Sequence, residues 1–217
     1  MQATSSRWMR GWAAAALALA IGASVSCGQA NNEGRAPSFL IIDALAASSG
    51  ATPDTFGSVL ESDVITNVKV TVGGQETYVP TIYEDQGKVT LKMALKDTGG
   101  SNSPTTPTSS NSITVTRYHV DFKRSDGRNT QGVDVPYSFD GGATGTFDAN
   151  GASLSFVLVR AQAKLEAPLK ALKGGGGAIV ISTVAEITFY GTDQNGNAVS
   201  VVGRISVNFA DWGDPTA

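Results

Sequence analysis

The chain has 217 residues, including 16 basic residues, 19 acidic residues, one histidine and one cysteine. This length suits one domain with a sizeable core. The acidic balance argues against a nucleic-acid partner. A single cysteine excludes an intrachain disulfide, and one histidine with one cysteine excludes a zinc site built from clusters of those residues.

The first 27 residues are organised like a secretory signal. Arg7 and Arg10 give a positive start, an apolar stretch covers 11–23, and small residues lead to Cys27. The apolar stretch is about 13 residues long, whereas a membrane-spanning helix needs about 20. The sequence therefore predicts that residues 1–26 are a signal peptide that is removed.

The residues Ser24-Val25-Ser26-Cys27 resemble the lipobox of bacterial lipoproteins, with Ser24 where that motif usually carries Leu. The resemblance implies cleavage before Cys27, diacylation of its thiol and acylation of the new amino group. In a diderm organism, Gly28 after the cysteine implies sorting to the outer membrane. The alternative is an ordinary secretory signal that leaves Cys27 as a free thiol near the mature terminus.

The chain from Cys27 onward has 14 basic and 19 acidic residues, because residues 1–26 contain two arginines and no acid. With a net charge of −5, any membrane contact is expected through the lipid. Residues 27–37 are polar and lack periodicity, which predicts a flexible tether. We expect the folded domain over 38–213 and a short tail over 214–217.

After the tether, apolar and polar residues alternate with a period of two, as in strands with one buried face. Val89, Leu91 and Met93 share one side of such a segment, and Val68, Val70 and Val72 share one side of another. Strands are predicted near 38–45, 64–72, 88–96, 113–124, 131–139, 143–147, 152–160, 178–190 and 197–209.

Turn and helix signals lie between these strands. Asp126-Gly127 and Asn195-Gly196 tolerate positive φ and predict tight hairpins. Leu165, Leu169 and Leu172 have helical spacing and predict one short helix. Pro168 can open this helix and Gly174 can close it.

Together these signals predict an all-β fold, an antiparallel β-sandwich of about seven to nine strands with one short helix between late strands. Over about residues 38–210 this architecture resembles immunoglobulin-like and fibronectin-III-like domains, which have many functions. The cysteine pair of antibody domains is absent, and Trp212 is the only Trp after the signal.

Two connections are unusually long. Residues 46–63 contain glycines and a proline, and residues 97–112 are a low-complexity run of Ser, Thr, Asn, Gly and Pro. The second is expected to be exposed and mobile. If successive strands alternate in direction, 46–63, 97–112 and 161–177 lie together at the end away from the tether, where loops would present binding residues.

The polar residues predict no catalytic residue, metal ligand or cofactor. His119 has the parity of Arg117 and Asp121 and is expected to face solvent, and no Gly-x-Ser-x-Gly motif accompanies it.

Asp193, Asn195 and Asn197 alternate as calcium ligands do. Ala198 and Arg204 occupy the positions where an EF-hand needs Gly and Glu, which favours a hairpin turn.

Four basic residues surround the Asp126-Gly127 turn. They form either a docking patch for an anionic partner or polysaccharide, or charges that discourage pairing at a strand edge. These residues are Arg117, Lys123, Arg124 and Arg128.

We therefore expect a membrane-anchored, non-catalytic extracytoplasmic lipoprotein that binds or assembles with an envelope protein or glycan. The alternative is a glycan-active enzyme or a carbohydrate-binding accessory protein. Sugar binding needs exposed aromatic rings, for which Tyr78 and Tyr83 are candidates. Glycoside hydrolysis would need two carboxylates in one concave pocket.

Overall fold

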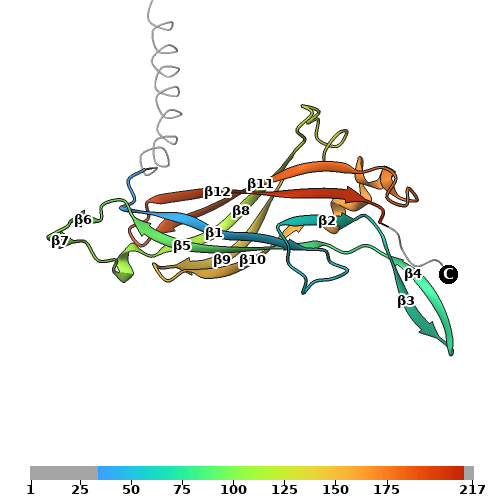
Figure 1. Cartoon of the computed structure of the whole chain (residues 1–217), viewed down its shortest axis with the longest axis horizontal. Coiled ribbons are helices and arrows are strands. Elements are labelled where there is room, and N and C mark those ends of the chain that lie inside the picture. Colours follow the sequence, from blue (N-terminus) through green and yellow to red (C-terminus); the bar gives the residue numbers. More distant parts are fainter. Residues whose placement is uncertain (1–33, 213–217) are drawn as a thin grey trace, which may run out of the picture.

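The computed structural model describes residues 34–212, which form a two-sheet β-sandwich with a two-stranded hairpin projecting from one end (Figure 1). The predicted all-β fold is confirmed, with more strands than expected. In chain order the elements are β1 Ser38–Ser48, β2 Val59–Asp63, β3 Thr66–Val72, β4 Gln75–Thr81, β5 Asp85–Leu95, β6 Gly99–Gly100, β7 Ser103–Pro104, η1 Ser109–Asn111, β8 Ile113–Lys123, β9 Phe139–Phe147, β10 Ala152–Val159, α3 Ala161–Leu165, η2 Leu169–Leu172, β11 Ile181–Asp193 and β12 Ala198–Ala210.

The strand order is that of an immunoglobulin-like sandwich. One sheet has the order β1-β5-β10 and the other β2-β12-β11-β8-β9. In immunoglobulin lettering these are A-B-E and A′-G-F-C-C′. All neighbours in the two sheets are antiparallel except β2 and β12, which run parallel. The short helices α3 and η2 connect β10 to β11, as expected for a helix between late strands.

The core between the sheets is built around aromatic side chains. The Tyr118 ring lies 5.1 Å from that of Phe156, which in turn lies 5.2 Å from Phe189. The Tyr118 hydroxyl accepts a hydrogen bond from the backbone N–H of Val157 at 3.2 Å, so a strand of one sheet is joined to a strand of the other. Burial of this ring raises the pKa of Tyr118, and the hydrogen bond from Val157 opposes that shift.

Most of the predicted alternation is confirmed. Val89, Leu91 and Met93 are buried on β5, and Tyr118, Val120 and Phe122 are buried on β8. The Asn195-Gly196 turn joins β11 and β12, where the N–H of Asp193 donates to the carbonyl of Asn197 at 3.0 Å. Gly196 has a φ of +81°, which the dipeptide predicted.

The strand predicted at 131–139 is wrong, and Asp126-Gly127 does not form a tight hairpin between strands. Residues 124–138 are an irregular connection in which the carbonyl of Thr130 accepts N–H groups of the following residues and Pro136 has no N–H to give. The strand begins at Phe139 instead and is rich in glycine. One of these glycines, Gly141, lies under the Tyr118 ring, where a Cβ would collide.

The single helix predicted around Leu165–Leu172 is two shorter pieces, α3 and η2. Pro168 precedes η2 at its N-cap. Leu169 and Leu172 are buried as expected, but Leu165 is 48% exposed. Because the chain bends between the pieces, the three leucines do not form one stripe.

The prediction that three long connections share one end is also wrong. Ser38 of β1 lies opposite Leu95 of β5, and Ser48 lies opposite Gln86. Residues 97–112 therefore leave the sandwich at the end where β1 begins, whereas the β1–β2 connection and 161–177 lie at the other end (Figure 1). The count failed because residues 64–72 do not run back along the sandwich. β3 projects from the far end, the unpredicted β4 returns the chain to that end, and β5 therefore runs opposite to β1. Residues 97–110 are exposed, as expected.

The alternation predicted over 64–72 is present, but it does not face the core. Val64 is fully buried, whereas β3 leaves the sandwich and pairs only with β4. Val72 at the end of β3 is 67% exposed. Figure 1 shows this hairpin extending away from both sheets.

We expect Val207→Asp to unfold the domain and Ser206→Asp to be tolerated. Val207 on β12 is fully buried and its neighbour Ser206 is exposed. An unpaired buried carboxylate costs several kcal/mol, against a total stability of about 5–15 kcal/mol. Urea denaturation followed by circular dichroism measures both, and equal midpoints for the two variants would contradict the assigned faces of β12.

Candidate functional site

The predicted lipid-attachment residue, Cys27, lies outside the described residues, so its acylation stays a prediction. The described chain enters at Gly34, whose carbonyl accepts a hydrogen bond from the Nζ of Lys96 just after β5. This contact places the start of the described chain at the end of the sandwich from which 97–112 also leaves. No helix within residues 34–212 has the length and apolar character needed to cross a membrane.

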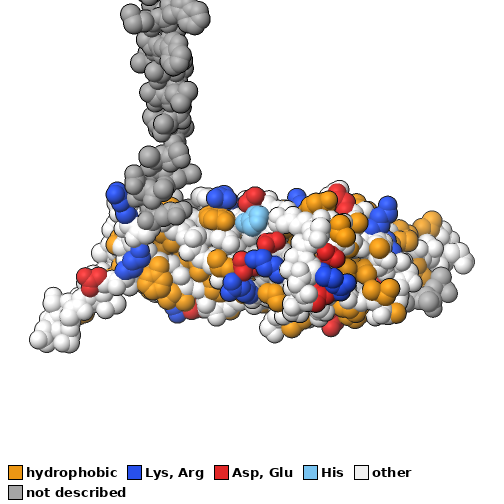
Figure 2. Space-filling view, turned by 90° about the horizontal axis from the view of Figure 1, so that it is seen from above, with side chains coloured by type: hydrophobic (Ala, Val, Ile, Leu, Met, Phe, Trp, Pro, Cys, Tyr) orange, Lys and Arg blue, Asp and Glu red, His pale blue; other side chains and the backbone are white. Residues whose placement is uncertain are grey.

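His119 faces outward on β8, as predicted. Its Nδ1 lies 3.2 Å from a carboxylate oxygen of Asp140 on β9, and the guanidinium of Arg117 lies 3.5 Å from the same oxygen. Figure 2 shows His119, the only histidine, among basic and acidic side chains on this outer face. These contacts lie at the surface, so each adds little to stability.

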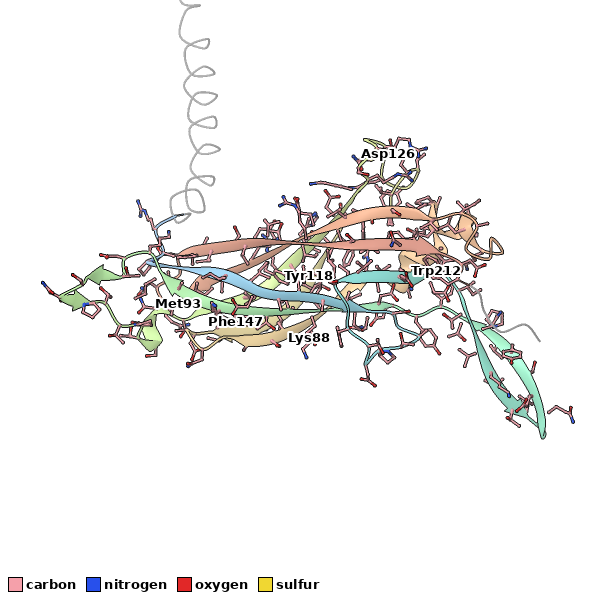
Figure 3. All side chains as sticks on the ribbon, in the orientation of Figure 1. Lys88, Met93, Tyr118, Asp126, Phe147 and Trp212 are labelled. Carbon is pink, nitrogen blue, oxygen red and sulfur yellow. The ribbon has the colours of Figure 1, made fainter. Side chains whose placement is uncertain are left out.

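The basic residues predicted as a patch are each paired with an acid. Arg124 and Arg128 both contact Asp126, at 2.7 and 2.8 Å. Their hydrogen bonds, that of Arg124 first, hold the pKa of Asp126 well below its usual range. Asp126 lies on the connection that rises above the five-stranded sheet (Figure 3). The edge-protection reading is wrong, because β8 lies inside its sheet between β11 and β9.

Glu186 is the centre of a second ion-pair group on the outer face. The Nζ of Lys123 donates to it at 3.1 Å from β8, and Arg204 donates at 2.7 Å from β12. These bonds, that of Lys123 first, lower the pKa of Glu186. The group therefore joins three neighbouring strands across the face of the sheet.

The oxygens of the Asp193 turn are used by the turn itself. The Asp193 carboxylate accepts N–H bonds from Asn195 and Asn197 and a third from the Asn197 side-chain amide, at 2.8–2.9 Å. The hairpin interpretation fits this geometry. Among the residues that the structure covers, no three His, Cys, Asp or Glu side chains gather in a way that could hold a metal ion.

A groove of about 580 Å³ lies at the same end as Gly34. Its lining includes the cations Lys96 and Arg117 and the aromatic rings of Phe39 and Tyr190, and it contains no Asp or Glu. The Arg117 guanidinium lies 3.9 Å from the centre of the Tyr190 ring and covers that face of it. The groove therefore offers cations to an anionic group, but not the paired carboxylates of a glycosidase.

The aromatic candidates for sugar binding are elsewhere. Tyr78 lies on β4 of the projecting hairpin and Tyr83 between β4 and β5, and both are half-buried.

A buried ion pair that sequence reasoning missed lies at the hairpin end of the sandwich. The Nζ of Lys164 on α3 lies 2.9 Å from each carboxylate oxygen of Asp85 at the start of β5. The Ser62 hydroxyl donates to the same carboxylate at 2.6 Å and the Gly50 N–H at 2.9 Å. Both charged side chains are almost completely buried. We call these four residues the Asp85 cluster.

No feature of the sequence distinguishes Lys164 or Asp85 from exposed residues of the same types. Their separation of 79 positions has no local period. The structure requires glycine at position 50, because a Cβ there would collide with the carbonyl oxygen of Glu84, but this requirement is not visible in the sequence.

Comparison of the chain with protein-family models, curated proteins and solved structures gave no significant match. The fold class rests on the strand order alone, which is that of an immunoglobulin-like β-sandwich.

We expect Lys164→Met to lower the free energy of unfolding by about 3–5 kcal/mol, because it leaves the Asp85 carboxylate buried without its cation. Adding Asp85→Asn should recover more than half of that loss, since the neutral amide oxygen can still accept from the Gly50 N–H and the amide NH2 can donate to the Ser62 hydroxyl. Chemical denaturation gives all three values. Lys170→Met, at an exposed position of η2, is the control, and a loss as large as that of Lys164→Met would contradict the assignment.

The ion pairs of Glu186 predict a dependence of stability on acid. A folded-state pKa below the usual value means that this carboxylate stabilises the fold above its unfolded pKa, and that the contribution is lost as the pH falls through the folded pKa. Glu186→Gln should therefore lower the urea midpoint more at pH 7 than at pH 3. An equal effect at both pH values would show that the ion pairs contribute nothing.

Proposed function

We propose that this chain is a membrane-anchored extracytoplasmic lipoprotein with a non-catalytic role in binding or assembly. The anchor is the acylated thiol of Cys27, which follows a signal-like segment and small residues. The partner is a protein or glycan of the cell envelope. If the organism is diderm, Gly28 favours the outer membrane.

The observation that carries this proposal is the arrangement of the sandwich along its long axis. Gly34, seven residues after Cys27, lies at one end, and the β3–β4 hairpin projects from the other (Figure 1). A lipid on Cys27 would hold the first end near the membrane. The hairpin would then be the part of the described chain presented farthest from it.

The polar groups of the described chain support a binding role. The outer-face charges are engaged in ion pairs with one another, and the Asp193 carboxylate is occupied by its own turn. The 580 Å³ groove has cations and aromatic rings but no acid that could act as a general base. Such a set can hold a ligand without transforming it.

We expect Cys27→Ser to move the protein from the membrane fraction to the soluble fraction or to leave its precursor uncleaved. The reason is that a serine hydroxyl does not replace the thiol that takes the lipid. Fractionation and the intact mass of the mature protein measure the change, with Ser26→Ala as the matched control. A wild-type protein that is soluble and has no added lipid mass would disprove the anchor.

A further inference from the structure

The two faces of the β3–β4 hairpin differ in chemistry. Cross-strand neighbours share a face, and Val68 lies opposite Val79 while Val70 lies opposite Thr77. With Val72 these residues form an uncharged face, which we call the valine face. The opposite face carries Lys69 and Glu76, whose charged groups are 2.6 Å apart.

The valine face is only partly covered in the described chain, where Val68 and Val70 are half-buried. Val79 is 44% exposed and Val72 67%, and neither β3 nor β4 pairs with any strand outside the hairpin. An isolated two-stranded ribbon is marginally stable in water, and stability usually requires a further strand or a packing layer. A ribbon with one charged and one apolar face is the pattern of a sheet that buries its apolar side.

The residues of this sequence after Trp212 are Gly-Asp-Pro-Thr-Ala, with one charge and no large apolar side chain to pack against valine. The polar residues 28–33 precede Gly34, whose carbonyl accepts from Lys96 at the end of the sandwich away from the hairpin. Neither segment carries the large apolar side chains that the valine face could pack against.

We propose that the valine face binds the valine face of a second copy of this chain around a twofold axis. The inference names the partner for the proposed assembly role and rests on that role. Twofold interfaces bring the same patch of two subunits together and are the commonest in homo-oligomers. Two ribbons packed in this way would form two layers, each burying its apolar side.

Charge favours a second copy. The only charged residues of 66–81 are Lys69 and Glu76, which cancel each other and lie on the opposite face. Two valine faces can therefore meet without burying a charge, although the chain from Cys27 has a net charge of −5. Two copies anchored in one membrane would also present their hairpins at the same height.

The test is crosslinking of the full chain through a single new thiol. Val79→Cys places an exposed thiol on the valine face, and Thr71→Cys places one on the charged face. Washed cells expressing each variant are treated with a short bismaleimide, because packed sheets lie about 10 Å apart, too far for a direct disulfide. Immunoblotting then measures the fraction at twice the monomer mass.

We expect at least about fivefold more double-mass product for Val79→Cys than for Thr71→Cys, since the two side chains point to opposite faces. Adding Val70→Asp to Val79→Cys should remove this product, whereas adding Thr71→Asp should leave it. Equal crosslinking of the two thiols, no product, or a product of another mass would overturn the second copy as the occupant.

The wild-type chain separates this proposal from the lipid anchor. Acylated Cys27 cannot react, so a double-mass product in the wild type would disprove the anchor and not the hairpin contact. The two thiol variants would then be compared in the Cys27→Ser background. The same outcomes support or overturn the hairpin contact there.

Discussion

The carboxylate of Asp85 fixes the end of the sandwich from which the hairpin leaves. Its three hydrogen-bonded partners come from the β1–β2 connection, β2 and α3. A buried charge must keep its partners, because the cost of leaving it unpaired exceeds that of most single contacts. Ser62 precedes the hairpin in the chain and Asp85 follows it, so one hydrogen bond closes the base of the hairpin. The direction in which the hairpin projects depends on this closure.

The sequence was sufficient to predict the fold class because most strands have one solvent-exposed face and one buried face. Val89 and Leu91 on β5 and Phe122 on β8 are buried where the alternation put them. Short or glycine-rich strands were harder to predict. The strand β2, for example, has only five residues. In β9, glycine is required by the overlying Tyr118 ring, a requirement that only the packed structure reveals.

The candidate site was less accessible to sequence reasoning. The outward position of His119 followed from parity, and the Asp193 turn followed from spacing. The pairing of Lys164 with Asp85 joins residues far apart in the chain and has no local signature. The valines of β3 were predicted to form one apolar face, and they do. Period-two alternation does not indicate, however, whether such a face packs against the core or lies outside it.

The course of the chain also determines how the domain bears mechanical load. The described chain enters β1 at one end, and the hairpin joins β5 at the other, while β1 and β5 are paired from Ser38 opposite Leu95 to Ser48 opposite Gln86. A pull between Gly34 and the hairpin therefore runs along these strands, at right angles to the hydrogen bonds between them. Under such a shear force the bonds of the pair share the load and do not open one after another. A protein held at one end and engaged at the other would resist extension along the direction in which it is pulled.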